Sequence, residues 1–373
     1  MKYEYILQSC LELRHRLHKN PELSNNEVET MKIIKEFIRS NSNMKIIEKS
    51  GYFYAMSFKG KEYENVAFRA DMDALPIEEK NDFLYKSINK GVAHKCGHDG
   101  HCAAIASICL FAEEIKNKNI FLLFQPAEEI GTGAKLIVED NFLKDNKINN
   151  IYAFHNIPKK SKGVIYFAEN IFAYASKGIV IKLNGKTSHA AYPEFGVNPA
   201  YAVADIVSYV KDITNLVKFE NGAMCTIISI KVGDKAFGTS AGYGEILLTI
   251  RAEREKDLQI LQNSITKCVE KISKEHKIKS ELEFCDEFPE TLNSSREVKR
   301  LKKLCIDNKI KYEELNEPFR WSEDFGYYTK EIPGVIFGIG AGEKWDQLHT
   351  EYYDFPDEIL SNVINIFFHI TSL

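Results

Sequence analysis

The sequence predicts an α/β fold with a mostly parallel central sheet and a second, inserted α+β domain. With 373 residues, the chain exceeds the roughly 250–300 residues at which a single hydrophobic core stops growing, so two domains are expected. Helix and strand patterns alternate in the first and last parts of the chain, whereas their order changes near Ala173. We therefore predict one domain from 1–172 and 286–373, interrupted by an insert over 173–285.

Helices and strands are predicted in turn along the first part of the chain. Apolar residues recur at helical spacing over 7–18 and 28–39, and NVAFRADMD is a short apolar run that ends in charge. A further helix is expected over 102–115. The run NIFLLFQPAEE, apolar on both faces as in a buried parallel strand, is followed by a helix over 134–139 and the strand NIYAFHN.

The insert has a different order of elements. KGIVIKLNG alternates as a strand does, a helix is predicted over 199–216, and AMCTIISIKVG and GEILLTIRAE read as strands. A helix over 257–276 and the strand SELEFC complete a β-α-β-β-α-β order, which is typical of a ferredoxin-like module. From residue 289 onward the α/β pattern returns with a helix over 295–307, the strand GVIFGIG and a closing amphipathic helix over 357–370.

Composition and charge restrict the class of partner. The formal net charge is −4, from 49 basic and 53 acidic residues spread along the chain, so no basic stripe for nucleic acid is present. The N-terminus has no apolar targeting region, and no run approaches the length of about eighteen apolar residues that a membrane helix needs. We expect a cytoplasmic protein that binds a small molecule, and neither nucleic acid nor membrane. Eight cysteines without a CxxC pair exclude a disulfide scaffold and a zinc ribbon.

Polar side chains follow several predicted strands of the first domain. In open α/β sheets, ligands bind outside the carboxyl ends of the strands, so these side chains are expected to meet at one rim. They are Asp71 and Asp73, Glu128 and Glu129, His155, and His349 after a longer loop, with Cys96 and His98 supplied just before a helix.

This set of side chains suits a metal-dependent hydrolase. Thiolate, imidazole and carboxylate together bind divalent transition metals, and bridging ligands allow two ions about 3.5–4 Å apart. Two ions polarise a carbonyl and activate a water molecule. Paired glutamates divide the remaining work, because one binds metal while the other takes a proton from the water.

Seven motifs occur in order: RADMDALP, HKCGHDGH, FQPAEE, FHN, GKTSHAAYP, SEDF and LHTEYYDF. With them the chain resembles the M20 family of metallopeptidases and amidohydrolases from Arg69 to Phe355. The similarity is greatest to the branch of N-acyl-amino-acid amidohydrolases, which includes hippurate hydrolase, auxin-conjugate hydrolases and N-acetyldiaminopimelate deacetylase.

The resemblance implies a role for each matching residue. The metal ligands are Cys96, His98, Glu129, His155 and His349, with Cys96 as the bridge between two divalent ions of manganese, zinc, cobalt or nickel. Glu128 is the general acid/base. His189 is a residue of the inserted lid that stabilises the tetrahedral oxyanion, and the lid commonly forms a homodimer. The segment from Asp234 to Gly244 departs from the family pattern, which leaves the lid contacts to substrate less defined.

Several alternatives stay open. Cys96 is a small core residue or, as in thiol hydrolases, a nucleophile with a histidine base. For the two glutamates, the alternative is a solvated helix start favoured by the helix dipole. For His155, the alternative is a structural histidine. The leading function is hydrolysis of the amide bond of N-acyl amino acids. The second candidate function is that of a dipeptidase or metallo-carboxypeptidase with the same site. The third is that of a non-catalytic metal-binding protein, and an intact Glu128 argues against it.

Overall fold

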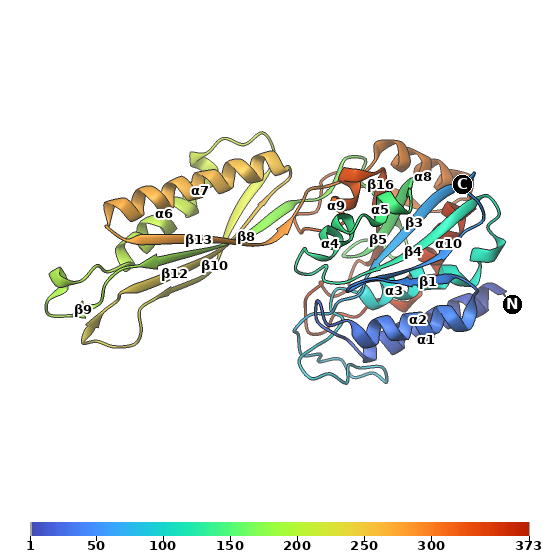
Figure 1. Cartoon of the computed structure of the whole chain (residues 1–373), viewed down its shortest axis with the longest axis horizontal. Coiled ribbons are helices and arrows are strands. Elements are labelled where there is room, and N and C mark those ends of the chain that lie inside the picture. The colour runs from blue at the N-terminus through green and yellow to red at the C-terminus, as the bar shows by residue number, and fades with distance from the viewer. Residues whose placement is uncertain (1, 373) are drawn as a thin grey trace. The chain divides into compact units, whose positions relative to one another are not determined.

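The chain folds into two units in the computed structural model, which describes residues 2–372 (Figure 1). The first unit contains the chain up to Phe172, Thr291–Glu317 and the chain from Asp324 onward, and the second contains Ala173–Glu290 and Pro318–Glu323. The sequence assigned 318–323 to the first domain. The structure places this segment in the second unit, because the Tyr174 backbone N–H donates to the Phe319 carbonyl at 3.0 Å and Arg251 donates to Ser322 Oγ at 2.8 Å.

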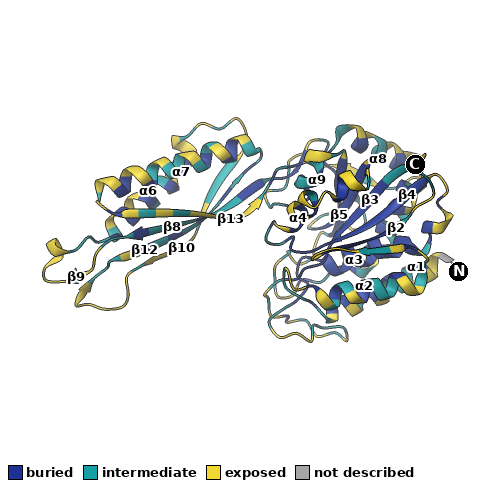
Figure 2. Ribbon diagram, viewed as in Figure 1, coloured by how far each residue is buried: buried dark blue, intermediate teal, exposed yellow. Residues whose placement is uncertain are grey.

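An eight-stranded sheet forms the centre of the first unit, in the order β1-β2-β4-β3-β5-β16-β6-β15. The four middle strands run parallel, whereas β1 and β2 are antiparallel at one edge and β6 pairs antiparallel with β16. The expected mostly parallel sheet is therefore confirmed. The strands are β1 Lys45–Glu48, β2 Phe53–Ser57, β3 Glu64–Asp71, β4 Lys118–Gln125, β5 Asn150–Pro158, β6 Ile165–Phe167, β15 Tyr312–Glu314 and β16 Gly334–Gly342. Figure 2 shows the middle strands buried along most of their length.

Helices cover this sheet. The helix α3 packs directly against β3 and β4, and α1 and α2 contact α3 from outside. The helices are α1 Lys2–Lys19, α2 Val28–Asn41, α3 His98–Ser107, α4 Gly133–Glu139, α5 Phe142–Asp145, α8 Ser295–Asp307, α9 Gly326–Glu331 and α10 Leu360–Ser372. The helix predicted over 102–115 is α3 at His98–Ser107, so it begins and ends earlier than predicted. It starts directly after Gly97, which has a left-handed backbone conformation, and two 3-10 turns follow it at Ile108–Leu110 and Ala112–Glu114.

The second unit confirms the ferredoxin-like module. Its sheet has the order β10-β12-β8-β13 with every neighbouring pair antiparallel. Alternate residues of β8 and β12, such as Ile181 and Leu248, are buried against α6 and α7. The elements are β8 Ala175–Asn184, α6 Ala200–Leu216, β10 Ala223–Val232, β12 Tyr243–Ala252, α7 Glu255–Glu275 and β13 Lys279–Phe288. Two short ladders complete the chain, β9 Ser188–His189 with β11 Thr239–Ser240, and β7 Ile171–Ala173 with β14 Thr291–Leu292.

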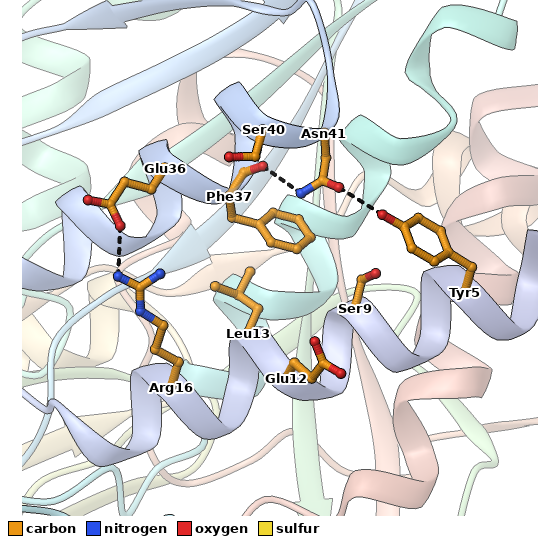
Figure 3. A pocket seen from close by; sticks show the side chains of 9 residues that line it. All are labelled: Tyr5, Ser9, Glu12, Leu13, Arg16, Glu36, Phe37, Ser40 and Asn41. Atoms are coloured by element: carbon orange, nitrogen blue, oxygen red, sulfur yellow. Dashed lines mark hydrogen bonds and ion pairs between the residues drawn. The ribbon is translucent and has the colours of Figure 1, made fainter.

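A surface groove of about 520 Å³ lies between α1 and α2 in the first unit (Figure 3). Four of its charged and polar side chains form two pairs, since Arg16 contacts Glu36 at 2.7 Å and Tyr5 donates to Asn41 at 3.1 Å. It contains neither cysteine nor histidine. The donors that suit a transition metal lie elsewhere. Within residues 2–372, no helix combines the length and apolar character that crossing a membrane requires.

Candidate metal centre

The residues predicted to bind metal come from four segments of the first unit. Most lie at the carboxyl ends of the parallel strands, as the α/β pattern predicts. His155 differs, because β5 continues past it to Pro158, and it therefore lies inside the strand and not at its end. Cys96 precedes α3 and His98 begins it, Glu128 and Glu129 follow β4, and His349 lies on the loop after β16.

The structure brings these side chains together in two overlapping groups. One consists of Cys96, His98 and His155, and the other of Cys96, Glu129 and His349, with the donor atoms of each group within 4.8 Å of one another. Cys96 Sγ lies 3.6 Å from His155 Nε2, and Glu129 Oε2 lies 3.5 Å from His349 Nε2. Because Cys96 belongs to both groups, the arrangement offers two metal positions that share one thiolate.

Unusual backbone conformations shape the segments that carry the donors. Gly97 has φ 99°, and a Cβ there would approach Asn156 Oδ1 to 2.5 Å, so glycine is required between Cys96 and His98. Ala127 and His349 also have positive φ, at 50° and 61°. Non-glycine residues in this region are strained and persist where their surroundings hold them, which is common at functional sites.

Hydrogen bonds orient the two buried histidines. His98 Nδ1 lies 2.9 Å from the Asp73 carbonyl, and His155 Nδ1 lies 2.9 Å from the Asn156 carbonyl. Such bonds place the proton on Nδ1 and present Nε2 to a metal. His98 Nε2 and Glu129 Oε1 are buried without a hydrogen-bond partner among the described residues. Buried polar atoms are rarely left unpaired, so these orphaned donors fit a bound divalent ion.

His101 and Asp71 also lie close to His98, but other contacts occupy them. His101 Nδ1 is 2.6 Å from Asp71 Oδ1, and His101 Nε2 is 2.6 Å from Asn156 Oδ1. The second oxygen of Asp71 accepts a hydrogen bond from Arg69 at 2.8 Å. Since both nitrogens of His101 are engaged, His101 orients Asn156, whose amide donates to the Cys96 carbonyl at 3.0 Å. We assign His101 and Asp71 to positioning the ligands.

The free protein holds protons where metal ions would bind. Burial disfavours charge on His98 and His349, but nearby acidic groups outweigh it. Asp71 and Cys96 raise the pKa of His98 well above its ordinary value, and Cys96 and Glu129 raise the pKa of His349 to about 11. Burial lowers the pKa of His155, which stays neutral. Metal binding must therefore release protons, and the affinity for metal should rise with pH.

Two further acidic residues support the segment of the glutamates, and the sequence indicated only the first of them, Asp73. Asp73 Oδ2 accepts from the Glu129 backbone N–H at 3.0 Å and from Ser24 at 2.7 Å. Glu27 accepts from the backbone N–H of the strained Ala127 at 2.8 Å, and burial raises the pKa of Glu27 to about 7. The segment that carries Glu27 has no motif, so only its contacts identify it.

A buried ionic network lies next to the ligand segment. His18 of α1 places Nδ1 2.8 Å from Asp99 Oδ2 and Nε2 3.0 Å from Glu79 Oε1. Arg14, one turn earlier, contacts Asp99 at 3.2 Å and Asp354 at 2.7 Å. Burial alone would lower the pKa of His18, but Asp99 and Glu79 raise it to about 9. His18 is therefore a buried imidazolium that joins two carboxylates.

We expect His18→Gln to remove part of the pH dependence of stability. The pKa of His18 is higher in the folded protein than its ordinary 6.5, so its contribution is complete below pH 6.5 and is lost as the pH rises through about 9. Each pKa unit corresponds to about 1.4 kcal/mol. Urea unfolding of the metal-free protein at pH 6.5 and 9.5 should show a larger loss for the wild type than for the variant. His276→Gln serves as control, because half-buried His276 contacts the single carboxylate of Asp205. Equal losses in wild type and His18→Gln would contradict this role of His18.

His189 lies in the second unit, on the short strand β9, and its side chain is exposed. The Ala191 backbone N–H donates to His189 Nδ1 at 3.0 Å, which places the imidazole proton on Nε2. Its partner strand β11 belongs to the segment that departs from the family pattern, with Thr239 opposite His189. The divergent segment therefore holds the backbone of His189.

Comparison with known proteins identifies the class. Residues 67–372 match the model of peptidase family M20/M25/M40, and the chain belongs to this family. It is a hydrolase of the metal-dependent M20 type, as the motifs predicted.

Relatives and solved structures agree over the whole chain. An uncharacterised hydrolase of Staphylococcus aureus is 29% identical over 373 residues, covering 95% of each protein, and one of Staphylococcus epidermidis is 29% identical over 378 residues, covering 96% of each. The crystal structure of Bacillus subtilis YXEP protein, a dinuclear metal binding peptidase from the M20 family, aligns with TM-score 0.83 and 23% identity, covering 99% of this chain and 98% of that one. The aminobenzoyl-glutamate utilization protein of Klebsiella pneumoniae aligns with TM-score 0.76 and 15% identity, covering 99% and 97%.

Proposed function

We propose that the protein hydrolyses the amide bond of N-acyl amino acids, releasing a carboxylic acid and a free amino acid. The observation that carries the proposal is the pair of donor groups that share Cys96, with the carboxylate of Glu128 directly beside them. His98, Glu129, His155 and His349 complete the ligand set. Two divalent ions held there would polarise the scissile carbonyl and lower the pKa of a water molecule.

Glu128 is the proton carrier of this reaction. Its side chain is 7% exposed, and its Oε2 lies 3.9 Å from His98 Nε2. Glu128 accepts a proton from the water as the water oxygen bonds to the carbonyl carbon. It then delivers that proton to the nitrogen as the C–N bond breaks, so that the amine leaves neutral.

The ligand atoms favour divalent transition metals, and the supply of each metal in the cell decides which of them binds. A thiolate, imidazoles and a carboxylate are accepted by manganese, zinc, cobalt and nickel. The cytoplasmic location and the absence of nucleic-acid and membrane partners stay predictions.

A substrate screen tests this function. The metal-free protein is loaded with each metal and offered N-acetyl, N-benzoyl and longer N-acyl amino acids beside dipeptides. We expect turnover of the acyl amino acids. Turnover of dipeptides alone would instead support the peptidase alternative, which the similarity to the Bacillus subtilis peptidase favours. No turnover of any amide by a fully loaded protein would support a non-catalytic metal-binding role.

We also propose that the second unit forms a homodimer and supplies His189 as the oxyanion donor. Strand β10 is an edge of its sheet, with Ile228 59% and Ile230 45% exposed, and such edges readily pair with another strand. The proton on His189 Nε2 is suited to donate to an oxyanion.

His189→Ala is expected to impair turnover and to leave metal content nearly unchanged, because an oxyanion donor acts on the transition state and binds no metal. Mixing decides whether the histidine acts across the dimer. A heterodimer of Glu128→Gln and His189→Ala subunits has one complete site if the donor comes from the partner, and it should recover up to half of wild-type activity. A mixed dimer as inactive as its parents would show that His189 serves its own subunit, and an active monomer would refute the arrangement.

A further inference from the structure

Lys95 is a fully buried lysine that the proposed mechanism does not use. It directly precedes Cys96, and its side chain has no exposed surface. Its Nζ donates to Glu79 Oε1 at 2.6 Å and to the Tyr353 carbonyl at 2.7 Å. Burying an ammonium group is costly even when it is paired. A lysine at this position therefore calls for a reason beyond packing.

The backbone of Lys95 makes a third contact. Its carbonyl accepts from the His349 backbone N–H at 2.8 Å. Lys95 thus binds the loop that carries His349 at two points, through its carbonyl at His349 and through its side chain at Tyr353. Tyr353 is itself buried, and its hydroxyl accepts from Asn156 at 2.5 Å.

The two metal positions differ in how their ligands are held. His155 lies within β5 and His98 begins α3, so regular elements fix both. His349 lies on a loop beyond the end of β16, is half-exposed and has a strained backbone. Nothing in the sheet fixes His349 relative to Cys96, but Lys95 contacts both segments.

We propose that Lys95 is a positioning residue that holds the His349 loop against the Cys96 segment. It thereby controls metal binding at the position formed by Cys96, Glu129 and His349, and leaves the position formed by Cys96, His98 and His155 almost unaffected. This inference rests on the proposed dinuclear function.

The ionic network explains why this residue is a lysine. Glu79 Oε1 accepts from both Lys95 and His18, and Glu79 Oε2 accepts from the Ser87 backbone N–H at 2.7 Å. An ammonium group can donate to a carboxylate and a carbonyl at once. Methionine would fill a similar volume without donating to either, so Lys95→Met breaks the link to the Tyr353 carbonyl.

Metal titration of the full chain tests the proposal. Metal-free wild type, Lys95→Met and the control Lys118→Met are titrated with Zn²⁺ and followed by calorimetry. Lys118 is also buried, but it lies at the start of β4, opposite the end that leads to Glu128. We expect Lys95→Met to bind one ion as the wild type does and the other about 10–100-fold more weakly, as when a contact that orients a ligand is lost. Hydrogen exchange of the His349 amide should accelerate in the metal-free variant.

A double variant separates positioning from an unpaired charge. Lys95→Met/Glu79→Gln removes both charges, so it also serves if the single variant does not fold. Positioning predicts that the second ion stays weak, because the Tyr353 carbonyl still lacks its donor. Recovery of the second ion, or two wild-type affinities in Lys95→Met, would overturn the inference. A wild type that binds fewer than two ions would instead overturn the proposed function.

Discussion

Glu128→Gln is expected to lower kcat by about 10²–10⁴-fold, the usual contribution of a general acid/base, while the metal content stays unchanged. Glutamine keeps the shape of the buried side chain and removes the proton acceptor. Glu128 lies outside the two groups that share Cys96, although its carboxylate also lies with His98 and Glu129 in a third set of neighbouring donor atoms. The loss should therefore appear in the chemical step and not in metal loading.

The neighbouring residue provides a matched comparison. Glu129→Gln makes the same chemical change one position later, yet Glu129 Oε1 is an orphaned buried atom and Oε2 faces His349. We expect this variant to lose metal from the position that Glu129 shares with Cys96 and His349. Steady-state rates and metal content by mass spectrometry report on both variants. Two fully loaded, equally active variants would show that neither glutamate has its assigned role.

Cys96→Ala is expected to lose both ions and all measurable turnover, because Cys96 Sγ is the one donor common to the two groups. His349→Ala should lose one ion only, since His349 belongs to a single one of these groups. The control is Cys305→Ala, which removes a buried thiol from α8. Metal content of the three purified variants decides the matter. A Cys96→Ala protein that retains two ions would contradict the shared-thiolate arrangement.

Periodicity and composition predicted most of the fold. The run NIFLLFQ is apolar on both faces, and β4 is buried along its whole length. The segment 295–307 has a strong amphipathic pattern, and α8 occupies that range. The change of order near Ala173 reflects an inserted module with its own core, which is why a local pattern revealed it.

Helices and strands whose apolar residues do not recur at a regular spacing were missed or misplaced. The strands β6 and β15 have three residues each, too few for an alternation to appear. The start of α3 was placed too late, because every residue of HDGHCAAIAS is buried and no exposed polar face alternates with an apolar one. The 318–323 segment joins the second unit through backbone hydrogen bonds to Tyr174 and a contact between Arg251 and Ser322, and both partners lie far away in the sequence.

The sequence predicted some residues of the candidate site and missed others. Cys96, His98, Glu129, His155 and His349 were predicted because their residue types and motifs indicate metal chemistry. Lys95, Glu27 and His18 were not identified. Their partners lie far away in the sequence, as with His18 and Asp99, so no local spacing reports the contact. Supporting contacts of this kind become visible only in three dimensions.

The proposed hydrolysis requires a dinuclear metal centre. Metal-free protein is titrated with a divalent ion that supports turnover, and hydrolysis of an N-acyl amino acid is followed at each addition. We predict no turnover without metal and a rise that ends at two equivalents per chain. Full turnover by the metal-free protein, abolished when Cys96 is alkylated, would contradict the metal mechanism and establish Cys96 as a nucleophile.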